Sequence, residues 1–242
     1  QVVPGCQDLP ASEAVELMTT DPLLVVDQIS LRFGGVQAIS GVSFTVDTGE
    51  LFAIIGPNGA GKTSIFNCIN AVYHPQEGSS TLDGTELVGM HSRRTAELGV
   101  ARTFQNLGLF GNLDIVDNLM LGRHHLMRTG LLSAAVWWGR AKNEEIANRA
   151  KVEEIIDLLE LGNHRRKPVG MPPYGIQKRI DLGRTLAMEP RLLLLDEPVA
   201  GMNLEETEDM ARFILDVRSN LNLTMIMVEH DMHVVMDLAD RV

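Results

Sequence analysis

The sequence contains little cysteine, few aromatic residues and less basic than acidic charge. Cys6 and Cys68 are its only cysteines, and Phe, Trp and Tyr make up 5% of its 242 residues. Two thiols argue against a disulfide scaffold and for a reduced cytosolic protein. The net charge of −11 disfavours nucleic acid as a partner, because proteins that bind nucleic acid usually present a basic surface.

Long hydrophobic runs are also absent from the sequence. A membrane-spanning helix needs about 18 or more consecutive apolar residues, and the most apolar run outside the expected strands, GLLSAAVWWG at 130–139, is too short. Residues 1–21 include Asp and Glu but no basic region, so we expect a polar leader and no signal peptide. The chain starts at Gln1 without an initiator Met, and we expect a fragment that is cut at both ends, with a C-terminal segment missing.

The rest of the chain alternates between short apolar runs and amphipathic segments. We expect strands at 23–30, 42–47, 50–56, 78–87, 100–105, 191–196 and 223–229, and helices at 61–73, 92–99, 114–126, 143–161, 175–188, 203–220 and 231–239. Strands and helices alternate at both ends of the chain, and helices cluster in its middle. This order predicts an α/β fold with a mainly parallel sheet and an inserted α-helical subdomain. On the helix at 143–161 we expect one apolar face, formed by Ile146, Ala150, Val152, Ile155, Ile156 and Leu159.

A glycine-rich motif follows the apolar run at 50–56. Residues 56–63, GPNGAGKT, fit the pattern G-x-x-x-x-G-K-[ST] between a buried strand and a helix. Such a loop turns backbone N–H groups and a helix N-terminus toward phosphate oxygens, with Lys62 on the β- and γ-phosphates and the Thr63 hydroxyl near Mg²⁺. A chance match, an ordinary glycine-rich turn, is expected in on the order of one in a hundred chains of this length. The residues expected to contact a nucleotide are Gly56, Pro57, Asn58, Gly59, Ala60, Gly61, Lys62, Thr63 and Ser64.

Two carboxylates end the most hydrophobic of the expected strands. In LLLLDEP, at 192–198, the strand leads directly into Asp196 and Glu197. Ligands of parallel sheets lie beyond the carboxyl ends of the strands, so Asp196 is expected to face the same crevice as Lys62 and to hold Mg²⁺ through water. Glu197 is then placed to orient or deprotonate an attacking water, and its alternative role is a cap on the following turn.

His230 and Gln105 follow two further expected strands. His230 stands one residue past the apolar run of TMIMVEHD (224–231), where it would reach a γ-phosphate. Gln105 ends VARTFQ (100–105). Either side chain has an ordinary alternative, a structural hydrogen bond for the histidine and simple solvation for the glutamine.

In order and spacing, these motifs resemble the nucleotide-binding subunit of an ABC transporter over residues 22–242. The resemblance makes GPNGAGKT the Walker A loop, and Asp196 and Glu197 the Walker B aspartate and the catalytic glutamate. It also makes Gln105 the Q-loop residue, which contacts Mg²⁺ and the reacting water, and His230 the switch histidine.

The same resemblance implies a fold and two further positions. The fold is a RecA-like P-loop NTPase core with an antiparallel β part, at about 22–110 and 190–242, and a helical subdomain at about 111–189. Phe33 lies where the family stacks an aromatic ring on adenine, with a core phenylalanine as the alternative. Asn203, in AGMN (200–203), occupies the D-loop position where Asp is common.

The stretch MPPYGIQKRIDLGR (171–184) stands where the family's signature, usually Leu-Ser-Gly-Gly-Gln, is expected. One register aligns Gln177 with the signature Gln. The other aligns Arg179 with the Arg that follows the signature, and we prefer it because it continues without a gap to the Walker B strand. The serine position is then Pro173, and only Gly175 matches. We expect the helix start near Tyr174 and Gly175 to offer N–H groups to a phosphate, without the serine hydroxyl.

By this resemblance the chain binds and hydrolyses ATP with Mg²⁺ in a dimer that sandwiches two ATP molecules. Each nucleotide lies between one subunit's Walker A loop and the other subunit's signature. The expected partners are a second ABC ATPase subunit, either a copy of this chain or a different one, transmembrane permease subunits and, indirectly, a solute-binding protein. The altered signature favours a heterodimer with one strong and one weaker ATP site. The expected location is the cytoplasmic face of the inner membrane, as a peripheral subunit.

The choice of subfamily depends on segments outside the ATP motifs. The insertion at 122–145 and the stretches TFQNLGLFGNLDIVDNLMLG (103–122) and PYGIQKR (173–179) resemble importers of branched-chain or other hydrophobic amino acids. Importers of urea or short-chain amides are the alternative within the same group. A soluble ABC ATPase that acts away from membranes is the alternative outside it. LLSAAVWW (131–138) is expected either to contact a partner or to pack on its own domain.

Overall fold

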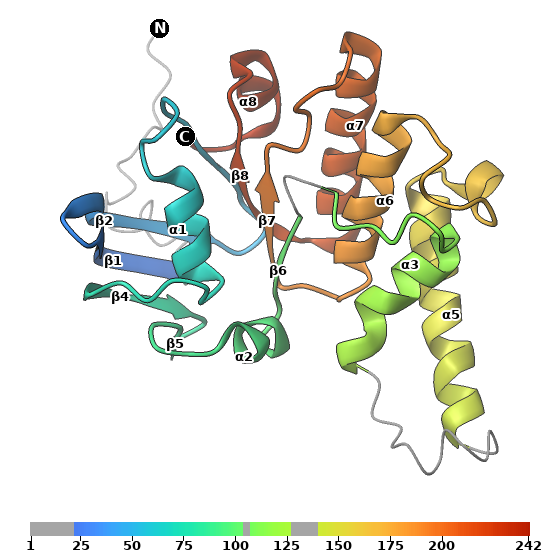
Figure 1. Ribbon diagram of the computed structural model, residues 1–242, viewed down its shortest axis with the longest axis horizontal. Coiled ribbons are helices and arrows are strands. Elements are labelled where there is room, and N and C mark those ends of the chain that lie inside the picture. The colour runs from blue at the N-terminus through green and yellow to red at the C-terminus, as the bar shows by residue number, and fades with distance from the viewer. Residues whose placement is uncertain (1–21, 104–106, 127–139) are drawn as a thin grey trace, which may run out of the picture.

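The computed structural model describes residues 22–103, 107–126 and 140–242, which form two sheets with helices packed around them (Figure 1). The strands are β1 (Pro22–Phe33), β2 (Val36–Asp47), β3 (Leu51–Ile54), β4 (Glu77–Leu82), β5 (Thr85–Glu86), β6 (Val100–Arg102), β7 (Leu192–Asp196) and β8 (Thr224–Val228). The helices are α1 (Lys62–Ile69), α2 (Ser92–Glu97), α3 (Ile115–Gly122), α5 (Arg140–Leu158), α6 (Tyr174–Leu186), α7 (Leu204–Leu221) and α8 (Met232–Leu238), with 3₁₀ turns η1 (Arg123–Leu126) and η2 (Gly162–His164). The predicted α/β fold, with a parallel sheet and a separate antiparallel sheet, is confirmed.

The central sheet is parallel and has the strand order β3-β8-β7-β6. Leu192 of β7 is paired with Thr224 of β8 on one side and with Val100 of β6 on the other. Because the four strands run in the same direction, their carboxyl ends share one edge of the sheet. The loops that follow β3, β7 and β8 therefore begin side by side, and they contain most of the residues that the sequence singled out.

Side chains of the central sheet alternate between two apolar cores, since successive residues of a strand point to opposite faces. In β7, Leu192 and Leu194 belong to the core shared with α1 and the antiparallel sheet, where Phe66 is fully buried. Leu193 and Leu195 belong to the core on the other face, which the α6–α8 side of the molecule covers. The unbroken run of leucines is thus explained by burial of the strand on both faces.

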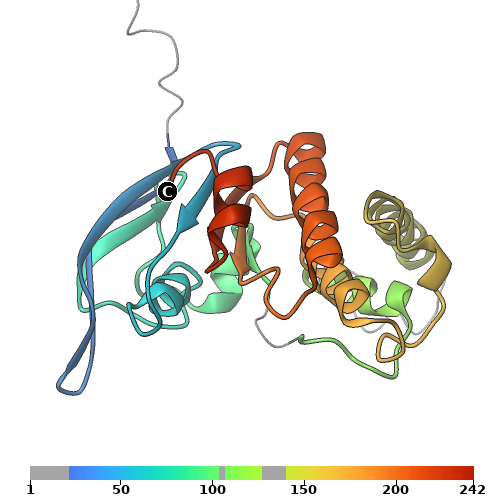
Figure 2. The same cartoon turned by 90° about the horizontal axis from the view of Figure 1, so that it is seen from above.

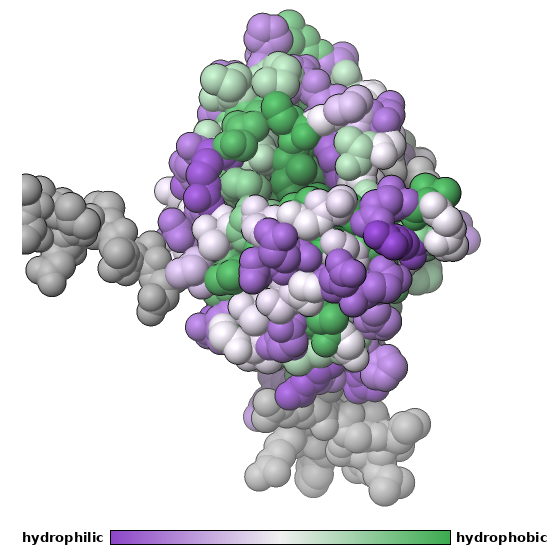
Figure 3. All heavy atoms as spheres, turned by 90° about the vertical axis from the view of Figure 1, so that its left-hand side faces the viewer, coloured by the Kyte–Doolittle hydropathy of each residue, from purple (hydrophilic) through white to green (hydrophobic). Residues whose placement is uncertain are grey.

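The antiparallel sheet has the order β2-β1-β4-β5 and lies on the α1 side of the molecule (Figure 1). In β1, Leu24, Val26 and Ile29 are buried against the same core as α1, whereas Asp27 and Gln28 face outward. Figure 3 shows this side of the molecule, where mostly polar residues surround a hollow in which hydrophobic residues gather. The half-buried face is the usual pattern of an antiparallel sheet.

Helices α3, α5 and α6 pack on one another at the end opposite the antiparallel sheet (Figure 2). Val152, Ile156 and Leu159 face their shared core, as the sequence predicts. The expectation for Ile146 and Ala150 is wrong: Ile146 is 56% exposed, Ala150 is also exposed, and the buried residue between them is Asn148. The reason is a polar contact, because the Asn148 side chain accepts a 2.7 Å hydrogen bond from Nε of the buried Arg123.

In the part of the chain that the structure describes, no helix is both long and apolar enough to cross a membrane. The leader at 1–21 and the apolar LLSAAVWW at 131–138 lie outside the described residues, as does Gln105.

Candidate active site

The loop between β3 and α1 has the shape of an anion cradle. Gly61 precedes the first residue of α1 with φ of 96°, and Gly59 also has positive φ, at 82°. A Cβ at Gly61 would lie 2.5 Å from the Ala38 carbonyl oxygen, so only glycine fits there. The first N–H groups of α1 have no carbonyl partner within the helix. They point outward from its N-terminal end, where an anion is favoured.

Lys62 is buried at the floor of this loop and is 7% exposed. Its ammonium donates to the carbonyl oxygen of Gly56 at 2.6 Å and to that of Pro57 at 3.0 Å. The lysine thus bridges the loop's own backbone, and its charge lies at the centre of the cradle. Thr63, the next residue, is exposed.

Asp196 ends β7 with a carboxylate that is almost completely buried. Arg102, the last residue of β6, donates to its Oδ2 at 2.5 Å, and the same guanidinium donates to Asn67 of α1 at 2.6 Å. The backbone N–H of Asp196 donates to the hydroxyl of Thr103 at 3.1 Å. Arg102 therefore joins the carboxylate of the central sheet to the helix that carries the phosphate loop.

Glu197 begins the turn after β7 in a strained conformation. Its φ is 49°, in the left-handed region, which costs a residue other than glycine about 1–3 kcal/mol. Its N–H donates to the Val228 carbonyl at 2.9 Å, and its own carbonyl accepts from Ala200 N–H at 3.2 Å and from the Lys178 ammonium at 3.1 Å. These three hydrogen bonds hold the main chain of Glu197 in this conformation, with its side chain directed into the candidate site.

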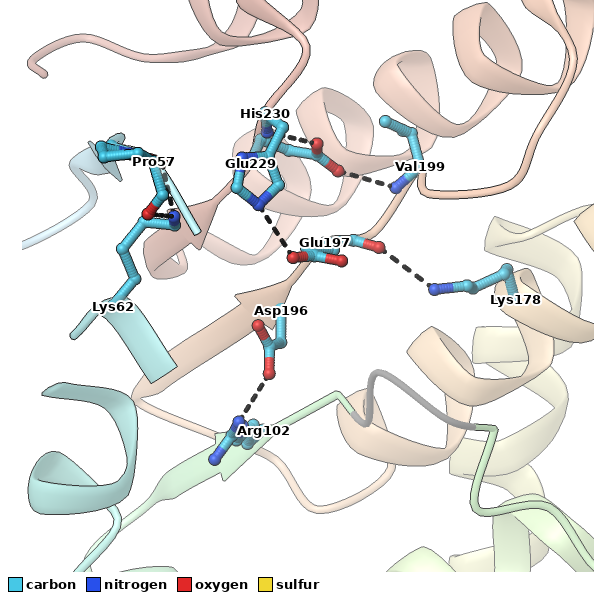
Figure 4. A network of polar contacts seen from close by, with 10 residues as sticks. Pro57, Lys62, Arg102, Lys178, Asp196, Glu197, Val199, Glu229 and His230 are labelled. Carbon is cyan, nitrogen blue, oxygen red and sulfur yellow. Dashed lines mark hydrogen bonds and ion pairs between the residues drawn. The ribbon is translucent and has the colours of Figure 1, made fainter. Parts of the chain in front are cut away.

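His230 meets the side chain of Glu197, because the two residues follow the neighbouring parallel strands β8 and β7. The His230 Nε2 lies 3.0 Å from Glu197 Oε1, where a protonated Nε2 donates to the carboxylate. Figure 4 shows Lys62, Asp196, Glu197 and His230 around the space beyond the carboxyl ends of the sheet. The N-cap of the next helix, α7, is Asn203 and not Glu197.

Glu229, which the sequence analysis did not single out, is a buried carboxylate that joins two of these loops. One of its oxygens accepts from Val199 N–H at 3.0 Å, and the other accepts from His230 N–H at 2.9 Å (Figure 4). It is 3% exposed. The signal that pointed to Asp196, a carboxylate at the end of a buried strand, applies equally to Glu229.

The start of α6 contains the two residues expected at the signature. Gly175 donates its N–H to Glu206 Oε1 at 3.3 Å, and a Cβ at Gly175 would lie 2.7 Å from that oxygen. The Tyr174 ring lies against Gly201, where an added Cβ would be 3.4 Å from the ring, and the tyrosine is 41% exposed. The helix entry is stiff, because Pro172 and Pro173 precede it and Pro173 is its N-cap.

Phe33 lies at the surface and not in the core. It is 46% exposed at the end of β1, and its ring meets Tyr73 edge to face with centroids 5.0 Å apart. The alternative of a core phenylalanine is therefore wrong. The second aromatic ring, Tyr73, follows α1 and gave no signal in the sequence.

The structure brings together most of the residues expected at the site. The phosphate loop, Asp196, Glu197 and His230 share one edge of the sheet, whereas Gln105 lies outside the described residues. Sequence reasoning missed Arg102, Lys178 and Glu229. Arg102 contacts Asp196 across 94 positions of the chain, and no local pattern encodes such a pair.

Comparisons with known proteins agree with this geometry. A family model described as ABC transporter matches residues 39–200. The high-affinity branched-chain amino acid transport ATP-binding protein LivG of Salmonella typhimurium is 38% identical over 226 residues, which cover 92% of this chain and 88% of LivG. The corresponding BraF of Pseudomonas aeruginosa is 38% identical over 224 residues, covering 91% of this chain and 87% of BraF.

Solved structures show the same fold. The ADP conformation of MJ1267, an ATP-binding cassette of an ABC transporter, superposes with a TM-score of 0.79 at 25% identity, covering 91% of this chain and 86% of that one. A nucleotide-free ATP-binding cassette from an ABC transporter gives a TM-score of 0.78, also at 25% identity, over 90% and 85% of the two chains. From its motifs, its fold and these relatives, the chain belongs to the ABC transporter family of ATP-binding proteins.

Proposed function

We propose that this chain is the ATP-binding and ATP-hydrolysing subunit that powers an importer of branched-chain or other hydrophobic amino acids. The observation that carries the proposal is the convergence of the Lys62 loop with Asp196, Glu197 and His230 at one sheet edge (Figure 4). The amino-acid class is supported by the names of LivG and BraF, which are transport ATP-binding proteins of that class.

ATP is proposed to bind across the phosphate loop and the end of β1. The backbone from Gly56 to Ser64 surrounds the phosphates, and Lys62 exchanges its two carbonyl contacts for the β- and γ-phosphate oxygens. The exposed ring of Phe33 stacks on adenine. Tyr73 supports that ring from the side.

Mg²⁺ is proposed to be held by Thr63, Asp196 and Gln105, together with phosphate oxygens and water. The donors fit this ion, because hydroxyl, amide and carboxylate oxygens are its usual ligands and it needs few of them from the protein. When bound, Mg²⁺ neutralises charge on the β- and γ-phosphates.

Hydrolysis is proposed to proceed by positioning and charge stabilisation. Water attacks the γ-phosphorus, Glu197 orients it and accepts its proton, and ADP leaves. His230, 3.0 Å from the carboxylate, holds Glu197 in place and reaches the γ-phosphate. Gln105 is proposed to contact the same water.

The signature stretch is proposed to act on the nucleotide of a second ATPase subunit. Tyr174 is 41% exposed at the start of α6, so it can face a partner. The Gly175 N–H, which donates to Glu206 Oε1 at 3.3 Å, is proposed to exchange that contact for a phosphate oxygen. Pro173 stands in the serine position and provides no hydroxyl. We therefore propose a heterodimer in which the site completed by this chain's signature is the weaker one.

Transmembrane permease subunits are proposed to dock where the regions at about 22–110 and 111–189 meet. A groove there is lined by residues of α2, α3, η1, α6 and the loops beside them, including Arg93, Phe110, Leu121, His125 and Met188. Phe110 is 57% exposed and Leu121 is 41% exposed, which suits burial by a helix of the membrane subunit. Docking there places the chain on the membrane's cytoplasmic face as a peripheral subunit.

Uptake by proteoliposomes tests the proposal. The chain is reconstituted with its permease subunits, second ATPase and solute-binding protein, and ATP-dependent uptake of labelled leucine is compared with uptake of labelled urea. Leucine uptake that is lost with Lys62→Ala supports the proposal. Uptake of urea alone would assign the chain to the other importers of its group, and full ATPase activity without permease association would indicate a soluble ATPase.

A further inference from the structure

A buried lysine connects the signature helix to the turn that carries Glu197. Lys178 lies one turn into α6 and is 5% exposed. Its ammonium donates to the Glu197 carbonyl oxygen at 3.1 Å (Figure 4). Lys178 is on the helix that faces the partner's nucleotide, whereas Glu197 serves the nucleotide of this chain.

Lys178 contacts the strained main chain of Glu197. Glu197 has φ of 49°, and its hydrogen bonds to Val228 and Ala200 come from the main chain of its own turn and of β8. Lys178 adds a bond from a different element. A strained residue persists only when its surroundings fix it, so a donor from outside the turn is one of the constraints that keep Glu197 in place.

The start of α6 is fastened to the same segment at two further points. Gly175 donates to Glu206, and the Tyr174 ring packs on Gly201. Glu206 in turn completes the capping box of α7 with Asn203. The segment at 197–206 and the first turns of α6 are therefore held together as one unit.

The Lys178 ammonium is surrounded by the acidic groups of the candidate site. Burial lowers the pKa of Lys178, and the charges of Asp181, Glu229, Glu197 and Asp196 oppose that shift. A buried ammonium is expensive to desolvate, and it is retained where carboxylates and a hydrogen-bond acceptor offset that cost. The four carboxylates and the bond to the Glu197 carbonyl point to a role in the site.

We propose that Lys178 is a positioning residue for ATP hydrolysis, which fixes the Glu197 backbone and links it to the signature helix. The inference rests on the proposed role of Glu197 as the residue that activates water. A shift of α6 at the partner's nucleotide is then transmitted through the Lys178 ammonium to the carboxylate at this chain's own nucleotide.

The test is Lys178→Met in the assembled transporter. Met removes the donor and keeps the length, so we expect kcat for ATP to fall by about tenfold or more, because a displaced catalytic group costs that much or more. KM for ATP should stay within about twofold, because ground-state binding is unaffected. The urea midpoint of unfolding should fall, because the substitution leaves buried carboxylates without a nearby cation, and Lys178→Arg, which retains a cationic donor, should recover most of kcat. Lys151→Met is the matched control, since Lys151 is exposed on α5 and pairs with Glu154.

Glu197→Gln, measured in the same assembly, separates the proposed catalytic role of Glu197 from the proposed positioning role of Lys178. If Glu197→Gln loses turnover and Lys178→Met does not, the inference is overturned and the proposed function stands. If Glu197→Gln keeps full turnover, the role of Glu197 and the inference both fail. If Lys178→Met lowers the unfolding midpoint but leaves kcat unchanged, or raises KM as much as it lowers kcat, the lysine is structural and the inference is overturned.

Discussion

Single residues at the candidate site are held by basic groups from distant parts of the chain. Arg102 pairs with Asp196 and Lys178 holds the Glu197 carbonyl, across 94 and 19 positions respectively. The acidic residues themselves were predictable, because a carboxylate directly after an apolar strand is conspicuous. Their partners were not predictable, because only the folded sheet brings β6, β7 and α6 together.

Arg102→Met tests the pairing of Asp196. Removing the guanidinium leaves a carboxylate that is 2% exposed without its partner. Breaking a buried ion pair in this way should lower the free energy of unfolding by about 3–5 kcal/mol, measured in urea without nucleotide. Arg102→Met combined with Asp196→Asn should recover much of the loss, and equal stability of both variants would contradict the pairing.

Cys68 provides a pH-dependent prediction. Burial raises the pKa of its thiol from 9.0 to about 11, so the folded state keeps the proton while the unfolded state releases it above pH 9. Stability contributed by the neutral thiol is full below pH 9 and is lost as pH rises toward 11, by up to about 3 kcal/mol. The difference in unfolding free energy between the wild-type chain and Cys68→Ala should shrink over that range, and a constant difference would exclude the shift.

At the scale of elements, the residues at a helix end predict where the helix starts. The expected helix at 203–220 is α7 (Leu204–Leu221), and its start is fixed by a capping box in which Asn203 accepts from Glu206 N–H and Glu206 accepts from Asn203 N–H. The interior of α5 was harder to predict. Its inward-facing Asn148 is hydrogen-bonded to Arg123, which lies on another element. Hydrophobic periodicity cannot predict a contact of this kind.

Asn203→Ala tests the cap. It should reduce the free energy of unfolding by about 1 kcal/mol, within the usual range of about 0.5–2 kcal/mol for loss of an N-cap. Asn203→Asp keeps the acceptor and should be nearly neutral. Urea unfolding of the two variants checks the prediction, and equal destabilisation by Ala and Asp would show that the side-chain acceptor is not what matters.

At the scale of the whole molecule, the proposed function assigns to one chain both a set of hydrolytic residues and an altered signature. The fold class and the order of motifs were predictable because strand, loop and helix follow one another locally along the chain. The assembly was not, because it depends on a partner's surface. In the proposed heterodimer, the Pro172-Pro173 entry to α6 provides no hydroxyl to the partner's site, whereas Lys62 and Glu197 serve this chain's own site.

Lys62→Ala tests this asymmetry in the assembled transporter. It disables the site that an intact partner signature would complete, so ATPase activity should fall by about a hundredfold or more. The equivalent lysine substitution in the second ATPase disables the weaker site and should cost less. Steady-state ATPase rates decide the matter, and equal losses from the two substitutions would count against a heterodimer with unequal sites.

The most direct measurement of the central claim is ATP turnover by the assembled transporter with Glu197→Gln. Glutamine keeps the shape of the side chain but cannot accept the proton of water. We predict that turnover falls by about a hundredfold to ten-thousandfold, while ATP binding, followed with a fluorescent ATP analogue, is unchanged. Turnover equal to that of the wild type, with ATP bound, would contradict the assignment of Glu197 as the residue that activates water.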